Sequence, residues 1–235
     1  MDLQVRYRDD LGRECVSTPR AVHGLPVEEW PVLHEQRAYR GRKSKVRQWW
    51  SSTTKKGVSC RSQEHAYAAM FLDRDPRIVC LAAPSLQVEW REGERAGVVN
   101  PAFMARTAEG QQMLYLHSPA GREPDDQEWS VARAVAEEAG WQVDVARAPG
   151  GQLRRNVYIV SQFRHDEFAD ERSKTVLLET FARPLPLGEG ADAVDLPPGQ
   201  GRARSWHLLW TYDLTTHWDE PLTPDSLVWA AGAAA

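Results

Sequence analysis

Two apolar runs joined by a short turn constrain the fold more than any other part of this sequence. They occupy residues 100–119, NPAFMARTAEGQQMLYLHSP, and the turn falls at Ala108-Glu109-Gly110. Apolar runs of this length, bounded by turn residues, favour two strands whose side chains point into a core. Glu109 is the one carboxylate in the stretch, and it lies in the turn. We therefore expect a buried hairpin without an acidic side chain along either strand.

Helix and strand patterns alternate on both sides of this hairpin. Ser62 is a good N-cap for a helix over residues 61–76, which Pro76 stops. A second helix is expected over residues 125–141, because Asp125 and Asp126 suit its N-terminus and Gly140 suits its C-cap. The expected strands are a hairpin within 3–18 that turns at Asp10-Leu11-Gly12, a weak pair within 45–60, two strands divided by Pro84 within 77–90, VVNPAFMA, QMLYLHS, and WQVDVARA at 141–148.

This order predicts an α/β fold, in which a mixed sheet is flanked by helices. The end of the chain has a different pattern. Residues 156–165 fit either a strand or the start of a helix, and residues 168–183 have a helical pattern. A Pro- and Gly-rich stretch at 184–202 precedes an amphipathic helix at 204–214, and THWDEPL and SLVWA then favour a two-stranded wing. We expect a small winged-helix-like unit here.

Composition excludes several classes of protein. The chain has no run of roughly 18 apolar residues, so we expect no membrane span. Its first residues, MDLQVRYRDD, lack the apolar region of a signal peptide. Cys15, Cys60 and Cys80 are widely spaced and form no CxxC, which argues against a disulfide framework or a zinc site and fits a reducing cytoplasm.

A basic segment gives the strongest signal for a partner. Residues 37–56, RAYRGRKSKVRQWWSSTTKK, hold eight cations and no acid, although the net charge of the chain is −4. Like charges at this density repel each other unless a polyanion neutralises them, as a DNA backbone does. The alternative is a solvated basic face on a strand pair. The residues expected to contact DNA are Arg37, Arg40, Arg42, Lys43, Lys45, Arg47, Lys55 and Lys56, with Trp49 and Trp50 for packing or stacking.

Three stretches carry a resemblance to a known family. RSQEHAYAAMFLDRDPRIVCLAAPS is similar to the family pattern ESRLE…LLLDFDP…V…IAAQP, and NVYIVSQFRH is similar to NVRFLAGYRR. HLLWTYDLTTHWDEPLTPDSLV, at 207–228, resembles a C-terminal HLLW-G-L…DL..PLS..T.V. Because these occur in order over roughly residues 37–230, the chain resembles TnsA-like heteromeric transposase endonuclease subunits, especially the actinobacterial type.

The resemblance implies three parts: a β-rich N-terminal extension at 1–36, a restriction-endonuclease-like PD-(D/E)xK domain at 37–166, and the winged-helix-like unit at 167–235. Family members cut one strand at each transposon end, while an integrase-fold transposase cuts the other. That chemistry needs a helix Glu, an Asp at the start of one strand and Glu/Gln-x-Lys on the next. Carboxylates hold Mg²⁺, which lowers the pKa of its bound water, and the lysine helps to position that water.

The positions that match this site lack most of the required groups. The Asp falls on Ala102, and the lysine falls on His117 or Ser118. The helix Glu falls on His65, with Glu64 next to it. Adjacent helix positions differ by ~100°, so Glu64 is expected to face away from the site. One carboxylate rarely holds Mg²⁺, so the sequence predicts a degenerate site without a metal cofactor.

The sequence therefore predicts a TnsA-like pseudo-nuclease that acts by binding in a transposition complex. Its implied partners are double-stranded DNA, the integrase-fold transposase, an AAA+ regulator and an active TnsA-like paralogue, and no membrane. Arg202 and Arg204 lie near the start of the last helix, where they could meet phosphate or a protein partner.

Three alternatives stay open. The first is an active endonuclease that uses Mg²⁺ or Mn²⁺, with Glu64 in a shifted register. The second is a DNA-binding regulatory or defence protein that reuses the fold. The third is a rebuilt Zn²⁺ or Mn²⁺ site of His65, His117 and Glu64, against the simpler expectation that each histidine packs and hydrogen-bonds. Asp73 and Asp75 are expected to end the first helix and fix the turn after it.

Overall fold

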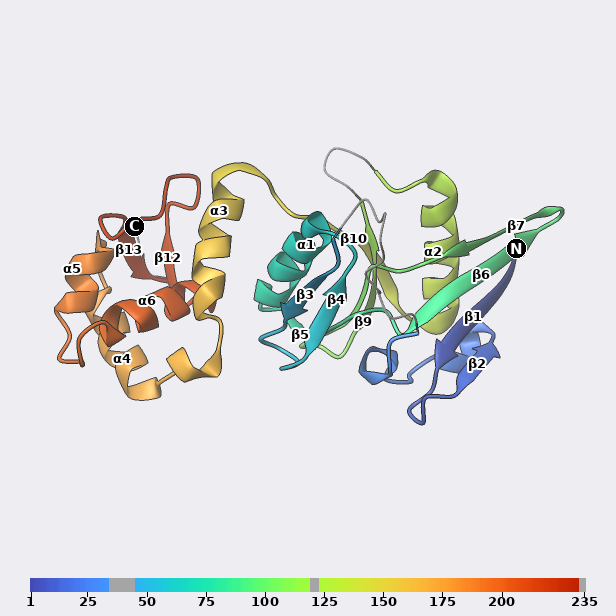
Figure 1. The fold of residues 1–235 in the computed structure, drawn as a ribbon, viewed down its shortest axis with the longest axis horizontal. Helices are drawn as coiled ribbons and strands as arrows, with labels where there is room; N and C mark the ends of the chain where they lie inside the picture. Colours follow the sequence, from blue (N-terminus) through green and yellow to red (C-terminus); the bar gives the residue numbers. More distant parts are fainter. Residues whose placement is uncertain (34–44, 119–122, 233–235) are drawn as a thin grey trace. The chain divides into compact units, whose positions relative to one another are not determined.

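The computed structural model describes residues 1–33, 45–118 and 123–232 (Figure 1). The chain divides into two compact units, Met1–Ala148 and Pro149–Ala235. This division differs from the predicted boundaries after residues 36 and 166. The first strand pairs within the sheets of the first unit, and the helix after Gly150 packs within the second unit, so contacts distant in sequence decide both boundaries.

The first sheet of unit 1 is antiparallel throughout. Its strands are β1 (Asp2–Arg8), β2 (Glu14–Ser17), β6 (Leu86–Glu92) and β7 (Arg95–Val99), in the order β2-β1-β6-β7. The N-terminal hairpin is as predicted. Asp9 closes its turn by accepting from the N–H groups of Leu11 and Arg13, and Gly12 adopts a φ of 77°.

The second sheet contains the hairpin that the sequence predicts most strongly. Its order is β10-β9-β8-β5, from β5 (Ile78–Ala82), β8 (Phe103–Thr107), β9 (Gln112–His117) and β10 (Gln142–Ala146). Strands β5, β8 and β9 are antiparallel neighbours, whereas β10 runs parallel to β9. The predicted single strand VVNPAFMA is wrong: Val99 ends β7 and Phe103 begins β8, because the chain passes at Pro101 from one sheet to the other.

Both helices of unit 1 begin and end as predicted. In α1 (Gln63–Arg74) the Ser62 hydroxyl accepts from the His65 N–H at 3.1 Å. In α2 (Asp126–Ala139) the Asp125 side chain accepts from the Gln127 N–H, and Gly140 ends the helix with a φ of 70°. Helix α2 packs against β6, β9 and β10, and α1 packs against β5 and a small hairpin (Figure 1).

A hydrophobic core lies between α2 and the two sheets. Its buried side chains come from β1, β6, β8, β9 and α2, and they include Leu3, Val5, Leu86, Val88, Met104, Leu114, Leu116, Val131 and Val135. Helices lie close to both faces of the second sheet, which is why the residues from Gln112 to Leu116 are all buried instead of alternating.

The remaining elements of unit 1 are short. Strands β3 (Arg47–Trp50) and β4 (Gly57–Cys60) form a separate antiparallel hairpin, and η1 (Pro19–Val22) and η2 (Val27–Glu29) are 3₁₀ turns. The β3–β4 pair lies beside α1 and β5 (Figure 1). The predicted weak strand pair within residues 45–60 is therefore confirmed.

Unit 2 is mostly helical. Residues 156–165, which the sequence left open, belong to α3 (Gly151–Val160), η3 (Ser161–Phe163) and the residues just after them. Strands β12 (Leu214–Thr216) and β13 (Leu227–Ala230) are antiparallel, and β11 (Leu185–Pro186) adds a third strand. Of the two strands predicted here, SLVWA forms β13, whereas THWDEPL is a strand only at Thr216, because the first strand begins earlier, at Leu214. The other elements are η4 (Asp166–Phe168), α4 (Glu171–Thr180), α5 (Leu187–Asp192) and α6 (Gln200–Trp210).

The molecule is mixed α/β, as the sequence predicts. Within the described ranges, no helix combines the length and the apolar character that a membrane crossing requires.

Candidate functional site

Three of the positions that match the nuclease site come together in space. His65, in the first turn of α1, stacks on Phe103 at the start of β8, with 4.3 Å between ring centroids. The His117 ring, at the end of β9, lies 5.0 Å from the His65 ring. Ala102 directly precedes Phe103, and its N–H donates to the Tyr115 carbonyl at 2.6 Å. Although His65, Ala102 and His117 are far apart in sequence, they therefore lie close together beside α1.

Hydrogen bonding fixes the tautomer of His65. Its Nδ1 accepts from the Arg61 N–H at 2.9 Å, so the hydrogen of the neutral ring is on Nε2. Burial lowers the pKa of His65 to about 3, with His117 and Arg61 acting in the same direction. The Nε2 atom is buried and has no hydrogen-bond partner among the described residues. Because its lone pair is used by the N–H bond, Nε2 of this tautomer cannot bind a metal.

The other positions that match the nuclease site do not complete a set of metal ligands among the described residues. His117 is half-buried, desolvation lowers its pKa, and its Nδ1 lies 3.4 Å from the Ala146 carbonyl oxygen. Glu64 is half-exposed, and its charge acts on His117 in the opposite direction. Ser118 is buried, and Ala102 offers only a methyl group. In the described part of the chain, no three His, Cys, Asp or Glu side chains are placed to share a metal ion, so the alternative set of His65, His117 and Glu64 is not assembled.

The described part of the basic segment forms the β3–β4 hairpin. Lys45, Arg47, Lys55 and Lys56 are exposed, and residues 45–60 contain no acid. The predicted contacts Arg37, Arg40, Arg42 and Lys43 lie outside the described residues. The hairpin thus presents a set of cations at the surface.

The two tryptophans of the hairpin have different environments. Trp50 lies opposite Gly57 in the strand pair and is 47% exposed. Trp49 points inward, is 9% exposed, and donates from Nε1 to Asp73 at 3.1 Å. Of the two predicted roles, packing fits Trp49, because it is buried and bonded to α1, and stacking on DNA stays a prediction for Trp50.

Asp73 has a role that sequence reasoning missed. It lies in the last turn of α1 and was expected only to end the helix, yet it is buried and faces the hairpin. Its Oδ1 accepts from Ser51 Oγ at 2.6 Å and from the N–H and hydroxyl of Thr53 at 3.2 Å. Its Oδ2 accepts from Trp49, and from the N–H and hydroxyl of Ser52 at 2.8 and 3.0 Å. The run of four hydroxyl residues at 51–54 was the signal available in the sequence.

Asp75 behaves as the sequence predicts. It is the C-cap of α1, and its carboxylate accepts from the Arg77 N–H at 2.9 Å and from the Arg77 side chain. The guanidinium of Arg77 lowers the pKa of Asp75. The turn into β5 is therefore fixed locally, whereas Asp73 acts at a distance of some twenty residues along the chain.

The two arginines predicted to meet phosphate in unit 2 are both paired with carboxylates. Arg202 forms hydrogen bonds with Asp192, including one from Nε at 3.0 Å. Arg204 donates to Asp170 at 3.0 Å and also to Ser173. A contact with phosphate at these positions would first require both ion pairs to open.

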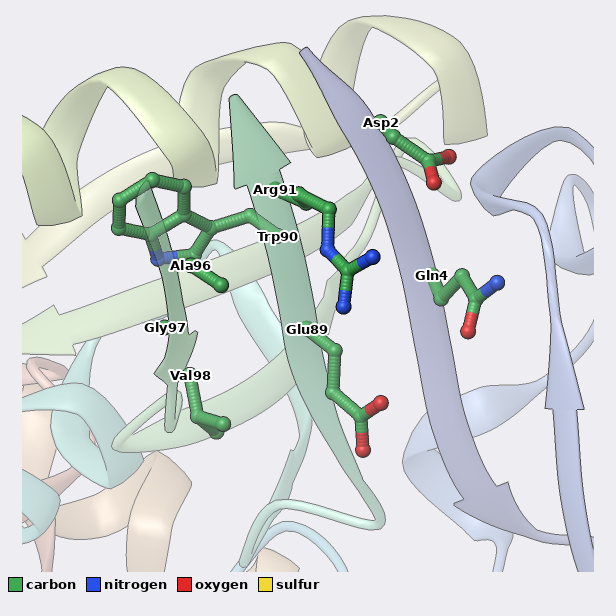
Figure 2. A pocket seen from close by; sticks show the side chains of 8 residues that line it. All are labelled: Asp2, Gln4, Glu89, Trp90, Arg91, Ala96, Gly97 and Val98. Carbon is green, nitrogen blue, oxygen red and sulfur yellow. The ribbon is translucent and has the colours of Figure 1, made fainter. Parts of the chain in front are cut away.

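A hollow of about 460 Å³ lies on the first sheet (Figure 2). Trp90 lies beside Ala96 and Gly97 in Figure 2, and a Cβ at Gly97 would come within 2.8 Å of its Nε1. The hollow mixes charges of both signs, and none of its residues was singled out from the sequence. It is lined by Asp2, Gln4, Glu89, Trp90, Arg91, Ala96, Gly97 and Val98.

Comparisons with known proteins leave the family open. A scan against protein-family models finds no match, and a search of curated proteins finds none either. The resemblance to TnsA-like subunits therefore rests on the sequence stretches quoted above.

Proposed function

We propose that this protein is a TnsA-like subunit of a heteromeric DNA-transposition complex, which binds double-stranded DNA and does not cut it. The observation that carries the proposal is the acid-free β3–β4 hairpin. It exposes Lys45, Arg47, Lys55 and Lys56 beside the helix that also bears His65. Clustered exposed cations favour a polyanion, and most protein–DNA affinity comes from such phosphate contacts.

The order of elements in unit 1 supports the nuclease-like part of the proposal. Helix α1 is followed by the antiparallel strands β5, β8 and β9, then by α2, and then by β10 parallel to β9. A restriction-endonuclease-like core has this helix–three strands–helix–strand order. The β6–β7 hairpin is an insertion between the first two of these strands, and it builds the other sheet with β1.

The chemistry at the matched positions supports a binding role. A methyl group at Ala102 and a neutral, buried imidazole at His65 supply no negative charge. Mg²⁺ dehydrates reluctantly and is held by charged oxygen ligands, so these groups are poor replacements for carboxylates. The stack of His65 on Phe103 instead fills the place with packed rings.

The partners of the complex come from the resemblance alone. We propose that unit 1 contacts the integrase-fold transposase, and that the winged-helix-like unit 2 contacts the AAA+ regulator or an active TnsA-like paralogue. In unit 2, the antiparallel strands β12 and β13 follow α6 directly, which is compatible with a helix and its wing.

The DNA-binding part is tested by reversing two exposed charges of the hairpin. In the double variant Lys55→Glu/Lys56→Glu, we expect affinity for a fluorescein-labelled duplex to fall at least ~10-fold. The dependence of log K on log salt should become shallower by about 2, because each lost phosphate contact lowers the slope by roughly 1. Fluorescence anisotropy over a salt series measures both quantities.

Arg20→Glu/Arg133→Glu is the matched control, since it changes the net charge equally at two exposed positions on η1 and α2. We expect this control to keep most of the affinity and the original salt slope. Equal losses in both double variants would show that net charge, and not the hairpin, governs binding.

A further inference from the structure

The contacts of Asp73 form a closed cluster between α1 and the β3–β4 hairpin. Asp73 is 4% exposed, and its six hydrogen bonds come from the neutral donors of Trp49, Ser51, Ser52 and Thr53. A buried carboxylate is costly unless hydrogen bonds satisfy it, and bonds to a charged acceptor are about twice as strong as neutral ones. Moving the loop away would break all six of these hydrogen bonds.

The same cluster sets the shape of the hairpin end that bears the cations. The Ser51 N–H donates to the Lys56 carbonyl at 2.9 Å, and the Lys55 N–H donates to the Ser51 carbonyl at 3.1 Å. Lys55 has a φ of 53°, a conformation that costs a non-glycine residue roughly 1–2 kcal/mol. Such a conformation persists only where the surrounding contacts hold it. The two exposed lysines follow directly after the residues that Asp73 binds.

We infer that Asp73 is a positioning residue for nucleic-acid binding: it holds the β3–β4 hairpin in the one shape that presents Lys55, Lys56 and Trp50 together to DNA. The inference rests on the proposed function, and it deepens it by naming the residue that organises the interface. Asp73 itself is buried, so it acts through the residues that it binds.

Charge and positioning predict opposite effects when Asp73 is neutralised. Asp73→Asn removes a negative charge close to a DNA-binding surface, so electrostatics alone predicts tighter binding to DNA. Loss of positioning predicts weaker binding and a shallower salt slope, because the lysines no longer reach their phosphates together. A variant that only lowered overall stability would not change the salt slope of the folded protein.

The experiment compares Asp73→Asn, Ser52→Ala and Glu138→Gln with the wild type. Ser52→Ala deletes one hydroxyl donor to Asp73 without changing any charge. Glu138→Gln is the matched control, since it removes one exposed carboxylate on α2. Two readouts are taken on the full chain: anisotropy with a labelled duplex over a salt series, and the rate of tryptic cleavage after Lys55 and Lys56 under native conditions.

We expect Asp73→Asn to be cleaved at least ~10-fold faster in the hairpin, because proteolysis follows the population of the opened segment. Its affinity for DNA should fall by about 10-fold with a shallower salt slope. Ser52→Ala should shift both readouts in the same direction by less, and Glu138→Gln should change neither. If Asp73→Asn does not fold, Ser52→Ala decides the outcome.

Unchanged cleavage in Asp73→Asn and Ser52→Ala would overturn the inference whatever the DNA result. Faster cleavage with equal or tighter DNA binding would leave Asp73 a structural residue and overturn its positioning role. If the wild type itself does not bind DNA, the proposed function fails, and with it the DNA role of Asp73. The cleavage rates then show separately whether Asp73 holds the hairpin.

Discussion

At the scale of single residues, burial decides the chemistry more than residue type does. His65 and Asp73 are both polar residues on α1, and both are almost completely buried. Asp73 keeps its hydrogen-bonding capacity because a loop brings it six donors. The ring of His65 accepts one hydrogen bond, from the Arg61 N–H, and burial keeps the ring neutral. A buried polar residue of a helix can thus either hold a neighbouring loop through hydrogen bonds, as Asp73 does, or pack as a neutral ring, as His65 does.

The neutral state of His65 predicts a pH dependence of stability. Its pKa is about 3 in the folded state and roughly 6.5 in an unfolded chain, so only the unfolded state takes up the proton as pH falls below 6.5. The free energy of unfolding should therefore decrease from pH 6.5 downward, by up to ~1.4 kcal/mol per pH unit from this group. His117 adds to the trend, since desolvation lowers its pKa as well.

The variant His65→Phe keeps an aromatic ring on Phe103 and removes the titration. We expect its free energy of unfolding to depend less on pH between 6 and 4 than that of the wild type, by up to ~1.4 kcal/mol per pH unit. Urea unfolding at a series of pH values measures this difference. Parallel pH profiles for the two proteins would contradict the assignment of a buried neutral His65.

At the scale of elements, the close approach of two helices explains a glycine that belongs to no sequence motif. Gly201, near the start of α6, lies so near α5 that an added Cβ would come within 2.1 Å of the Ala191 carbonyl oxygen. Gly150 precedes α3, and an added Cβ there would have no neighbour within 4 Å. Identical substitutions at these two glycines should therefore have different effects on unit 2.

Gly201→Ala should destabilise the protein, by roughly 1–3 kcal/mol, because a backbone carbonyl has to move to make room. This sign is informative, since Gly to Ala within a helix otherwise stabilises by about 0.5–1 kcal/mol. Gly150→Ala is the control: an added Cβ meets no neighbour there, so it should cost less than Gly201→Ala and only through the N-cap preference for glycine over alanine. Thermal unfolding of both variants measures the difference, and a Gly201→Ala protein as stable as the wild type would contradict the close packing of α5 and α6.

At the scale of the whole molecule, each unit has its own packed interior. The first unit contains His65, Ala102 and His117 together with the basic hairpin, and the second contains helices α3 to α6 with a small three-stranded sheet. The proposed division of labour follows these units: the first binds DNA and the transposase, and the second contacts the AAA+ regulator or an active paralogue. The proposed loss of cutting has to be tested with DNA present, since DNA phosphates can complete a metal site.

Calorimetric titration with Mn²⁺ tests this loss on the full chain, alone and with a DNA duplex present. We expect no binding in the low-millimolar range in either case, because the Ala102 side chain has no ligand atom, Nε2 of His65 carries a hydrogen, and its Nδ1 already accepts from Arg61. Binding that disappears in Glu64→Ala or His117→Ala would contradict the proposal. It would restore an active, rebuilt metal site as the better explanation.

The sequence by itself determined the elements whose signals are local. Ser62, Gly140 and the turn at Ala108-Glu109-Gly110 mark ends and turns through hydrogen bonds and φ values of nearby residues, so they could be read without a fold. For the candidate site, the sequence was enough to name the residues that align with the family's site, because the alignment depends only on the order of residues along the chain. It could not show that His65 stacks on Phe103.

Only the tertiary structure decided which side chains are buried and with whom they pair. Trp49 turned inward, Asp73 gained its donors from residues 49–53, and β1 joined the sheet of β6 rather than forming a separate extension. Each of these depends on contacts between segments far apart in the chain. Such contacts follow from the packing of the whole unit, and propensity and spacing carry no information about them.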